Sequence, residues 1–459
     1  MSRRAISEAL AWRLQSVGGR GERAYGNWDE DALTMAVEAG RAALGGREAV
    51  AGVTFASTTH PFLDRSNSGL VAEALALPAQ VTTQDAAGSQ RAGTSALMAL
   101  LEGTAPSTLL VAADRRATQP GSVQELNYGD GAAAVVVDGQ AELAEYLGGY
   151  SENIDFVDHY RQAGERHDYA LEDRWVRTEA WGPFVRRAVA ALLAKTSVAA
   201  PAITRVVLTA PRATAEPLIR TLGLTNATLV DGLHDRVGDT GVAHPLLMLA
   251  GALDEAMPGE VILVIGFGQG IDALLLRVSD SAPQRRTGRV LSGALARGLT
   301  DHAYVRFLSH GGALALDWGM RAERDMRTAH SVHYRKRAAL NGFVGGRCTA
   351  CDTVQFPAAP ACVNPECRAF APQTPIRLVD LPATVKTYTE DWLAFTPSPP
   401  LVYGNVAFEG GGNAFIEFAD VDPGEVSVGA AVMFVFRIKD IDHARGFHRY
   451  FWKATLRRS

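Results

Sequence analysis

The order of apolar and polar residues predicts alternating helices and strands over the first 330 residues. Helical spacing of apolar residues occurs in four segments: 29–44, 95–103, 184–196 and 245–257. Continuous apolar runs, typical of strands buried on both faces, occur at 50–58, 107–115, 131–139, 203–211 and 261–278. Because this order recurs, we expect a layered α/β fold with two similar halves, 1–160 and 161–330.

The pattern changes to strict alternation near the C-terminus. Alternating segments, separated by Gly and Pro turns, lie at 383–395, 401–410, 413–421, 431–441 and 449–456. This pattern predicts a small all-β barrel over 376–459. Between the two regions, 331–375 combines an amphipathic helix with a cysteine-rich segment.

All four cysteines of the chain lie in that segment, as Cys348, Cys351, Cys362 and Cys367. Two close pairs on either side of a proline-rich stretch suit a tetrahedral zinc site, which we expect to be structural because four thiolates leave no open position. Two disulfides or free thiols are the alternative, and cytosolic proteins rarely form disulfides. The first 347 residues contain no thiol, so no cysteine nucleophile can come from them.

Composition excludes several classes of protein. The chain has 459 residues, of which 47% are hydrophobic and 21% charged, as in globular proteins. A formal net charge of −5 argues against a broad nucleic-acid surface. No apolar run reaches the roughly 18 residues of a membrane span, and no secretory signal is visible. We therefore expect a soluble, cytoplasmic protein.

The C-terminal part, 331–459, resembles the zinc-ribbon and OB-fold domain that accompanies thiolases and related acyl-CoA enzymes. The resemblance rests on Gly345-Gly346-Arg347-Cys348, on Phe356-Pro357 and on the strand pair at 423–436. It implies a rubredoxin-like ribbon that contacts the coenzyme A substrate and a thiolase-fold partner. Nucleic-acid binding is the competing interpretation for an OB fold, but these strands lack an interleaved basic and aromatic ladder.

Five segments of the first 330 residues, in the same order, resemble prokaryotic 3-hydroxy-3-methylglutaryl-CoA synthases of the thiolase superfamily. They are 25–44, 84–103, 127–137, 238–253 and 265–276. The resemblance covers most of 25–330 and implies two duplicated α/β halves in a five-layered αβαβα arrangement. It also implies an acyl-CoA substrate and, commonly, a homodimer.

Four positions depart from what the resemblance implies. Gln90 replaces the nucleophilic cysteine, Thr58 the acid–base glutamate, Trp181 the histidine and Asp239 the asparagine. A carboxamide is not a nucleophile, and threonine does not titrate near neutral pH. The ordinary acyl-enzyme condensation is therefore not expected of this chain.

The start of the chain departs as well. The family opens with a strand that we expect to be internal to the sheet, whereas this chain begins with a helical segment, 3–15. Loss of an internal strand leaves its neighbours unpaired. A rebuilt start, a partner that fills the gap and a misassigned start codon are the alternatives.

Other chemistry remains open. Asp239, His244 and His60 are candidates for acid–base catalysis, with ordinary hydrogen-bonded structural histidines as the alternative. Gln90 is a candidate for holding a carbonyl oxygen during decarboxylation, with the indole N–H of Trp181 as a second donor.

The loop that contains Gly266, Gly268 and Gly270 is a candidate for facing the substrate thioester, as the family loop does. A tight turn between two strands is the alternative for this loop.

The first hypothesis for function is a zinc-ribbon-bearing subunit of an enzyme that makes or breaks a carbon–carbon bond next to a CoA thioester. It would act with a catalytically complete thiolase partner, as a homodimer, or both, without nucleic acid or membrane. The second is a self-sufficient, cysteine-free retro-aldolase or decarboxylase. The third is a CoA-binding scaffold without chemistry.

Overall fold

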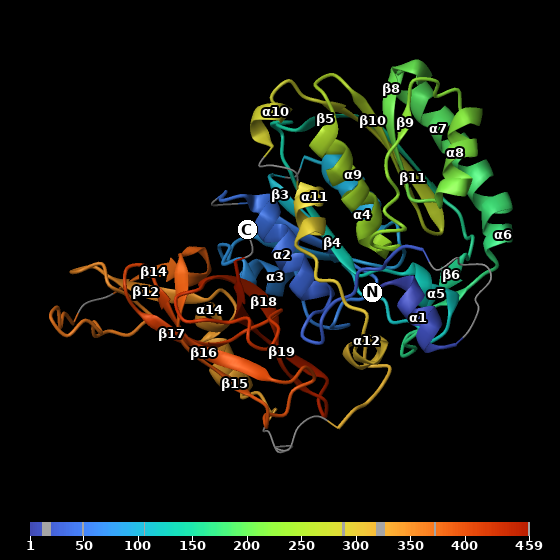
Figure 1. The fold of residues 1–459 in the computed structure, drawn as a ribbon. Helices are drawn as coiled ribbons and strands as arrows, with labels where there is room; N and C mark the ends of the chain where they lie inside the picture. The colour runs from blue at the N-terminus through green and yellow to red at the C-terminus, as the bar shows by residue number, and fades with distance from the viewer. Residues whose placement is uncertain are drawn as a thin grey trace. The chain divides into compact units, whose positions relative to one another are not determined.

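The computed structural model describes residues 1–11, 20–47, 50–104, 106–286, 290–317, 326–370 and 373–457 (Figure 1). Two compact units emerge. The α/β unit comprises Met1–Gly26, Ala39–Ser68 and Gln80–Leu308. The ribbon–barrel unit comprises Asn27–Glu38, Gly69–Ala79 and Ser309–Ser459. The finer division at 160, 330 and 375 stays a prediction.

The α/β unit contains two mixed sheets. The first has the order β2 (Thr82–Ala86), β1 (Gly52–Ala56), β3 (Thr108–Asp114), β4 (Gly131–Val137). The second has the order β9 (Thr228–Leu229), β8 (Ile203–Leu208), β10 (Val261–Phe267), β11 (Gly270–Val278), β5 (Ala144–Asn153). In both sheets the first three strands run parallel and the fourth is antiparallel. The predicted duplication is confirmed.

The two sheets differ at one edge. In the second sheet β5 pairs with β11 from Gly270 opposite Asn153 to Val278 opposite Ala144. In the first sheet no strand of the described residues pairs with the outer edge of β4. The expectation that the family's first strand is internal to its sheet stays a prediction. β4 is only half-buried, whereas β11, whose outer edge pairs with β5, is almost wholly buried.

Two helices, α4 (Ala92–Glu102) and α9 (His244–Glu255), form the layer between the sheets (Figure 1). Side chains alternate across a strand, so Ile262 and Val264 of β10 pack in the core that contains α4 and α9. Leu263 and Ile265 pack instead with α7 (Gly182–Thr196) and α8 (Arg212–Thr221). β10 is therefore buried on both faces, as its continuous apolar run predicted.

Shorter elements complete this unit. They are α1 (Arg3–Ala9), α5 (Val123–Asn127), β6 (His159–Tyr160), β7 (Tyr169–Ala170), α6 (Asp173–Trp175), a π-helical turn (Val176–Trp181), α10 (Ala282–Arg285) and α11 (Val290–Ala296). Three further helices include residues of both units: α2 (Ala32–Leu44), α3 (Asn67–Ala74) and α12 (Tyr304–His310). The helix expected at 3–15 covers Arg3–Ala9, and 12–15 lie outside the described residues.

The ribbon–barrel unit contains two antiparallel sheets after α13 (His330–Arg335) and α14 (Arg337–Leu340). The small sheet has the order β13 (Val354–Gln355), β12 (Val344–Cys348), β14 (Gln373–Arg377). The larger has the order β17 (Asn413–Glu417), β16 (Leu401–Phe408), β15 (Ala383–Asp391), β18 (Ala431–Asp442), β19 (Phe447–Leu456). The Ala419 N–H donates to Ala454 O at 2.8 Å and joins the two edges of the larger sheet. The predicted all-β C-terminal domain is confirmed.

None of the helices in the described residues combines the length and the apolar character that a bilayer crossing requires.

Candidate functional site

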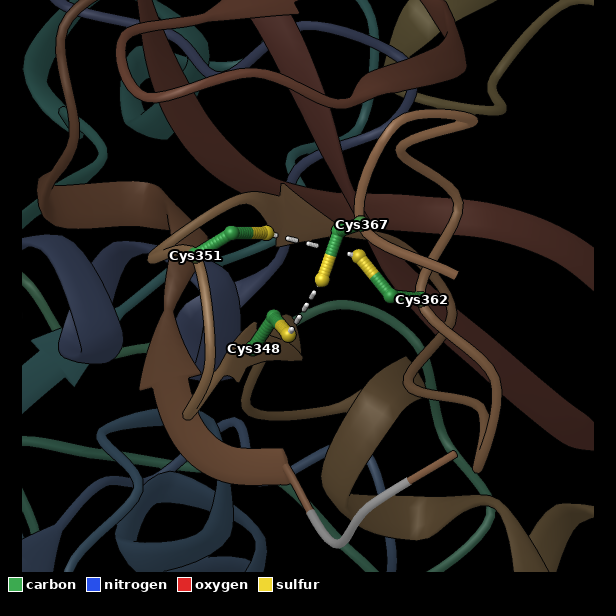
Figure 2. Close-up of side chains that lie close together, drawn as sticks. All are labelled: Cys348, Cys351, Cys362 and Cys367. Carbon is green, nitrogen blue, oxygen red and sulfur yellow. Dashed lines mark hydrogen bonds between the residues drawn. The ribbon is translucent and has the colours of Figure 1, made fainter. Parts of the chain in front are cut away.

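The four cysteines converge on one point (Figure 2). Their Sγ atoms lie within 4.8 Å of one another, with 3.6 Å between Cys351 and Cys362 and 4.0 Å between Cys348 and Cys367. A disulfide needs about 2.05 Å, whereas a tetrahedral zinc ion with bonds of about 2.3 Å holds sulfur atoms about 3.8 Å apart. The cluster therefore fits a four-thiolate metal site.

Polar neighbours hold the cysteine loops in place. The Asn364 N–H points at Cys362 Sγ at 3.4 Å, and the Thr353 hydroxyl lies 3.2 Å from Cys351 Sγ. The buried Gln355 side chain donates to Ala361 O at 3.1 Å and accepts from the Val363 N–H at 3.1 Å. Such outer contacts orient the ligands of a metal.

A second candidate site lies at the start of α4, where Gln90 comes two residues before the helix. The neighbouring Arg91 donates to Gly268 O at 3.0 Å and forms an ion pair with Asp272 Oδ1 at 2.9 Å. Asp272 is fully buried in β11 and also accepts from the Thr94 hydroxyl at 2.9 Å. These bonds fix the first turn of α4, and with it Gln90, against the end of the second sheet.

The glycine loop at this point is a tight hairpin between β10 and β11. Gly266 is the second-last residue of β10, Gly270 is the first residue of β11, and Gly268 lies in the turn between the two strands. A Cβ atom at Gly268 would come within 3.1 Å of the Gln90 backbone nitrogen. The loop is thus the tight turn between two strands that was given as the alternative, and it lies beside Gln90; its role toward a substrate thioester stays a prediction. Trp181 packs on Phe267 of this hairpin, with 4.3 Å between ring centroids.

The side chain of Gln90 contacts a histidine that the sequence did not single out. Gln90 Nε2 lies 3.0 Å from His159 Nε2, and His159 Nδ1 lies 2.7 Å from Asp158 Oδ2. An amide NH₂ group only donates, so Nε2 of the imidazole accepts and Nδ1–H donates to the carboxylate. Burial lowers the pKa of His159, but the hydrogen bond and the charge of Asp158 outweigh burial and raise it above the ordinary value.

Asp239 is held in a different set of contacts. Its Oδ2 lies 3.2 Å from Arg116 Nη2, and its Oδ1 accepts from the Gly241 N–H at 2.9 Å. Burial favours the neutral acid, but the positive charge of Arg116 prevails and holds the pKa of Asp239 well below its usual range. Asp239 is therefore ionised at neutral pH.

His244 is completely buried at the first residue of α9. Its Nδ1 accepts from the Thr240 N–H at 3.2 Å, and its Nε2 donates to Gly232 O at 2.9 Å. Burial lowers the pKa of His244 to about 4, although the charge of Asp239 opposes the shift. Both ring nitrogens already have partners, which favours a structural role for this candidate.

His60 and Thr58 lie in the loop after β1. His60 Nε2 donates to Phe55 O at 3.3 Å, and burial lowers the pKa of His60. Thr58 donates to the buried Asp114 carboxylate through its N–H at 2.8 Å and its hydroxyl at 3.0 Å. The structure thus brings Gln90, Trp181 and the glycine hairpin together, whereas His60 packs against Phe55 and donates to its backbone oxygen.

Known proteins are similar to the zinc-ribbon segment and to the α/β unit of this chain. Residues 335–373 match the family described as ChsH2, rubredoxin-like zinc ribbon domain. The hydroxymethylglutaryl-CoA synthase of Methanothermobacter thermautotrophicus is 29% identical over 318 residues, which cover 66% of this chain and 88% of the relative. The synthase of Pyrococcus horikoshii is 28% identical over 280 residues, which cover 58% and 79%.

Solved structures show the same fold. MvaS in complex with 3-hydroxy-3-methylglutaryl coenzyme A matches with a TM-score of 0.57 and 20% identity, over 67% of this chain and 88% of that one. FabH, a 3-oxoacyl-(acyl carrier protein) synthase III from Pseudomonas aeruginosa, matches with 0.52 and 22%, over 61% and 94%. The chain joins a thiolase-like fold to a rubredoxin-like zinc ribbon.

Within the thiolase-like fold, the residues that sequence reasoning missed are Asp158 and His159. Asp158 lies between β5 and β6, and His159 is the first residue of β6, in a stretch without periodic apolar residues. The only signal in the sequence is an acid next to a histidine. The pair becomes a candidate for catalysis only through the contact of His159 with Gln90, which lies 69 residues earlier in the chain.

Proposed function

We propose that this chain handles acyl-CoA thioesters as the zinc-ribbon-bearing subunit of an enzyme that makes or breaks a carbon–carbon bond next to the thioester. The homology to hydroxymethylglutaryl-CoA synthases supports the substrate class. The observation that carries the subunit role is Gln90 at the start of α4, in a chain whose four thiols all belong to the ribbon cluster. A partner with a thiol nucleophile would complete the chemistry.

In this proposal, the residues around Gln90 bind the thioester and the cysteine cluster has a structural role. Gln90 offers amide N–H groups to a thioester oxygen, and the missing side chain of Gly268 lets the hairpin lie directly against the residues that begin α4. Trp181 and Phe267 give an apolar wall. The four cysteines would hold a zinc ion that shapes the ribbon and, with its coordination filled, takes no part in the reaction.

Purification of the tagged chain from its native host, followed by mass spectrometry of what co-elutes, tests the subunit role. We expect a stoichiometric thiolase-fold protein that carries an active cysteine. A homodimer without any partner overturns the subunit role. Isothermal titration with acetyl-CoA tests the substrate class separately, and the absence of binding overturns it.

A second candidate function is a self-sufficient, cysteine-free retro-aldolase or decarboxylase of a CoA thioester. The hydrogen-bonded row Asp158–His159–Gln90 favours it, because such reactions need a proton acceptor and an oxygen-binding donor but no nucleophile. Turnover of a β-hydroxyacyl-CoA by the purified chain would support this function. Tight CoA binding without turnover or partner would instead indicate a scaffold.

A further inference from the structure

Three side chains from two distant segments form a hydrogen-bonded row at the start of α4. Asp158 Oδ2 accepts from His159 Nδ1 at 2.7 Å, and Gln90 Nε2 donates to His159 Nε2 at 3.0 Å. These contacts select the neutral imidazole with its proton on Nδ1. The lone pair of Nε2 therefore points toward Gln90. This neutral form of the imidazole is the one that can take up a proton.

The surroundings strengthen the basicity of this imidazole. The side chains of His159 and Asp158 are 16% and 15% exposed. Asp158 Oδ1 is buried and has no hydrogen-bond partner among the described residues, so the imidazole is the main partner of this carboxylate. The other charges that act on His159 are Arg116, which lowers its pKa, and Asp168, which raises it. The net effect raises the pKa of His159 above the ordinary value, because the hydrogen bond and charge of Asp158 outweigh burial, and this makes the imidazole a stronger base.

We propose that His159 is the catalytic base of this site, that Asp158 orients it and that Gln90 holds the thioester oxygen. This inference rests on the proposed function, in which the site binds an acyl-CoA. His159 Nε2 takes a proton from the α-carbon of the acyl group: the C–H bond breaks, an N–H bond forms, and the electron pair moves into an enolate. The return of a proton from Nε2 to the α-carbon reverses the step, so it needs no oxidant, reductant or second substrate. In D₂O the proton on Nε2 exchanges with solvent first, and the α-carbon then receives a deuteron.

Gln90 connects the base to the oxygen. Its amide nitrogen carries two hydrogens, and one of them lies on His159 Nε2 in the structure. When the α-carbon approaches Nε2, the carboxamide exchanges this bond for one to the thioester oxygen. The enolate oxygen then gains a donor at the moment its negative charge develops. An enolate is the species that any bond change at the neighbouring carbon requires.

Hydrogen–deuterium exchange into acetyl-CoA tests the proposal without knowledge of the natural acyl group. The full chain, alone and with any partner that co-purifies, is incubated with acetyl-CoA in D₂O, and loss of the methyl proton signal is followed by NMR. We expect exchange with the wild-type chain and a rate about 100-fold lower for His159→Gln. Asp158→Asn should slow exchange and shift the inflection of its pH profile to lower pH, because the charge that raises the pKa of His159 is gone.

His448→Gln is the matched control. His448 also faces a carboxylate, with 3.4 Å between its Nδ1 and Asp31 Oδ2, but both residues belong to the ribbon–barrel unit. The exchange rate of this variant should equal that of the wild type.

The outcomes separate the two proposals. Acetyl-CoA binding without exchange, or equal exchange by His159→Gln, overturns the role of His159 and leaves the proposed function standing. Absence of acetyl-CoA binding overturns both. If His159→Gln does not fold, the pH profile of Asp158→Asn decides, and an unshifted inflection overturns the proposal.

Discussion

The guanidinium of Arg116 lies between Asp239 and the ring of Tyr128. Its Nη2 is 3.2 Å from Asp239 Oδ2, and its Cζ is 3.6 Å from the ring centroid of Tyr128. The Arg116 side chain is 1% exposed, whereas that of Asp239 is 31% exposed. The cation is thus buried inside the thiolase-like fold, where Asp239 forms its ion pair and the charges of Asp114 and Asp168 also act on it.

Replacement of Asp239 by asparagine should therefore destabilise the fold. Breaking a fully buried pair costs about 3–5 kcal/mol, and the partial exposure of Asp239 reduces this to about 2 kcal/mol. Urea denaturation at pH 7 measures the loss. Glu216→Gln is the control, because its ion pair with Arg212 is exposed on a helix and should contribute less than about 0.5 kcal/mol. Equal small losses for both variants would contradict the prediction.

His244 should make stability depend on pH. Its pKa is about 4 in the folded chain and about 6.5 when unfolded, so between these values the unfolded chain binds the extra proton. Stability should fall as the pH drops from 6.5 to 4, by about 3 kcal/mol from this group. Urea denaturation of the wild type and His244→Gln at pH 7.5, 5.5 and 4.5 isolates the effect. Parallel curves for the two proteins would refute it.

Gly268→Ala should displace the start of α4. The new Cβ would meet the backbone nitrogens of Arg91 at 2.9 Å and Gln90 at 3.1 Å, and neither belongs to a flexible side chain. We expect at least a tenfold weaker acetyl-CoA affinity by isothermal titration. Gly164→Ala is the control: its backbone also has a positive φ, of 89°, but nothing lies within 4 Å of its Cβ position. Unchanged affinity for Gly268→Ala would argue against a substrate oxygen beside Gln90.

The ribbon should contain about one zinc ion per chain, measured by elemental mass spectrometry. Cys362→Ser should remove it, because three thiolates leave the coordination incomplete. Asn364→Ala should keep the ion but weaken its binding by about 10-fold or more in a chelator competition, because it removes the side-chain amide that donates to the Thr353 hydroxyl at 3.4 Å and accepts from the Glu366 N–H at 3.0 Å. Full retention of zinc by Cys362→Ser would contradict the four-thiolate assignment.

The sequence predicted those features that depend on local pattern. The spacing from Cys348 to Cys367 was enough to indicate a four-thiolate cluster, and apolar runs located β3, β10 and β11. The edge strand β2 escaped, because its residues Thr82–Asp85 are polar and exposed and leave no apolar run.

The site at α4 was predicted only in part. Gln90 was identified through the family resemblance, which aligns it with the nucleophilic cysteine, but its partner His159 was not identified, because their contact arises from tertiary packing of distant segments. The sequence also did not show that both ring nitrogens of His244 are hydrogen-bonded, because Gly232 and Thr240 become their partners only when the chain folds. Residue type indicates what a side chain can do, and only its neighbours show whether that capacity is still available.

The uneven edges of the two sheets have a consequence for how the fold opens. β11 lies between β10 and β5, whereas β4 is bonded to β3 alone in the described residues. Amide protons on the outer side of β4 have no strand partner among the described residues and should exchange with solvent without unpairing of the sheet, while those of β11 need its separation from β10 or β5. The two copies of the duplicated architecture are alike in topology but unequal as cooperative folding units, and the second half is the more resistant of the two.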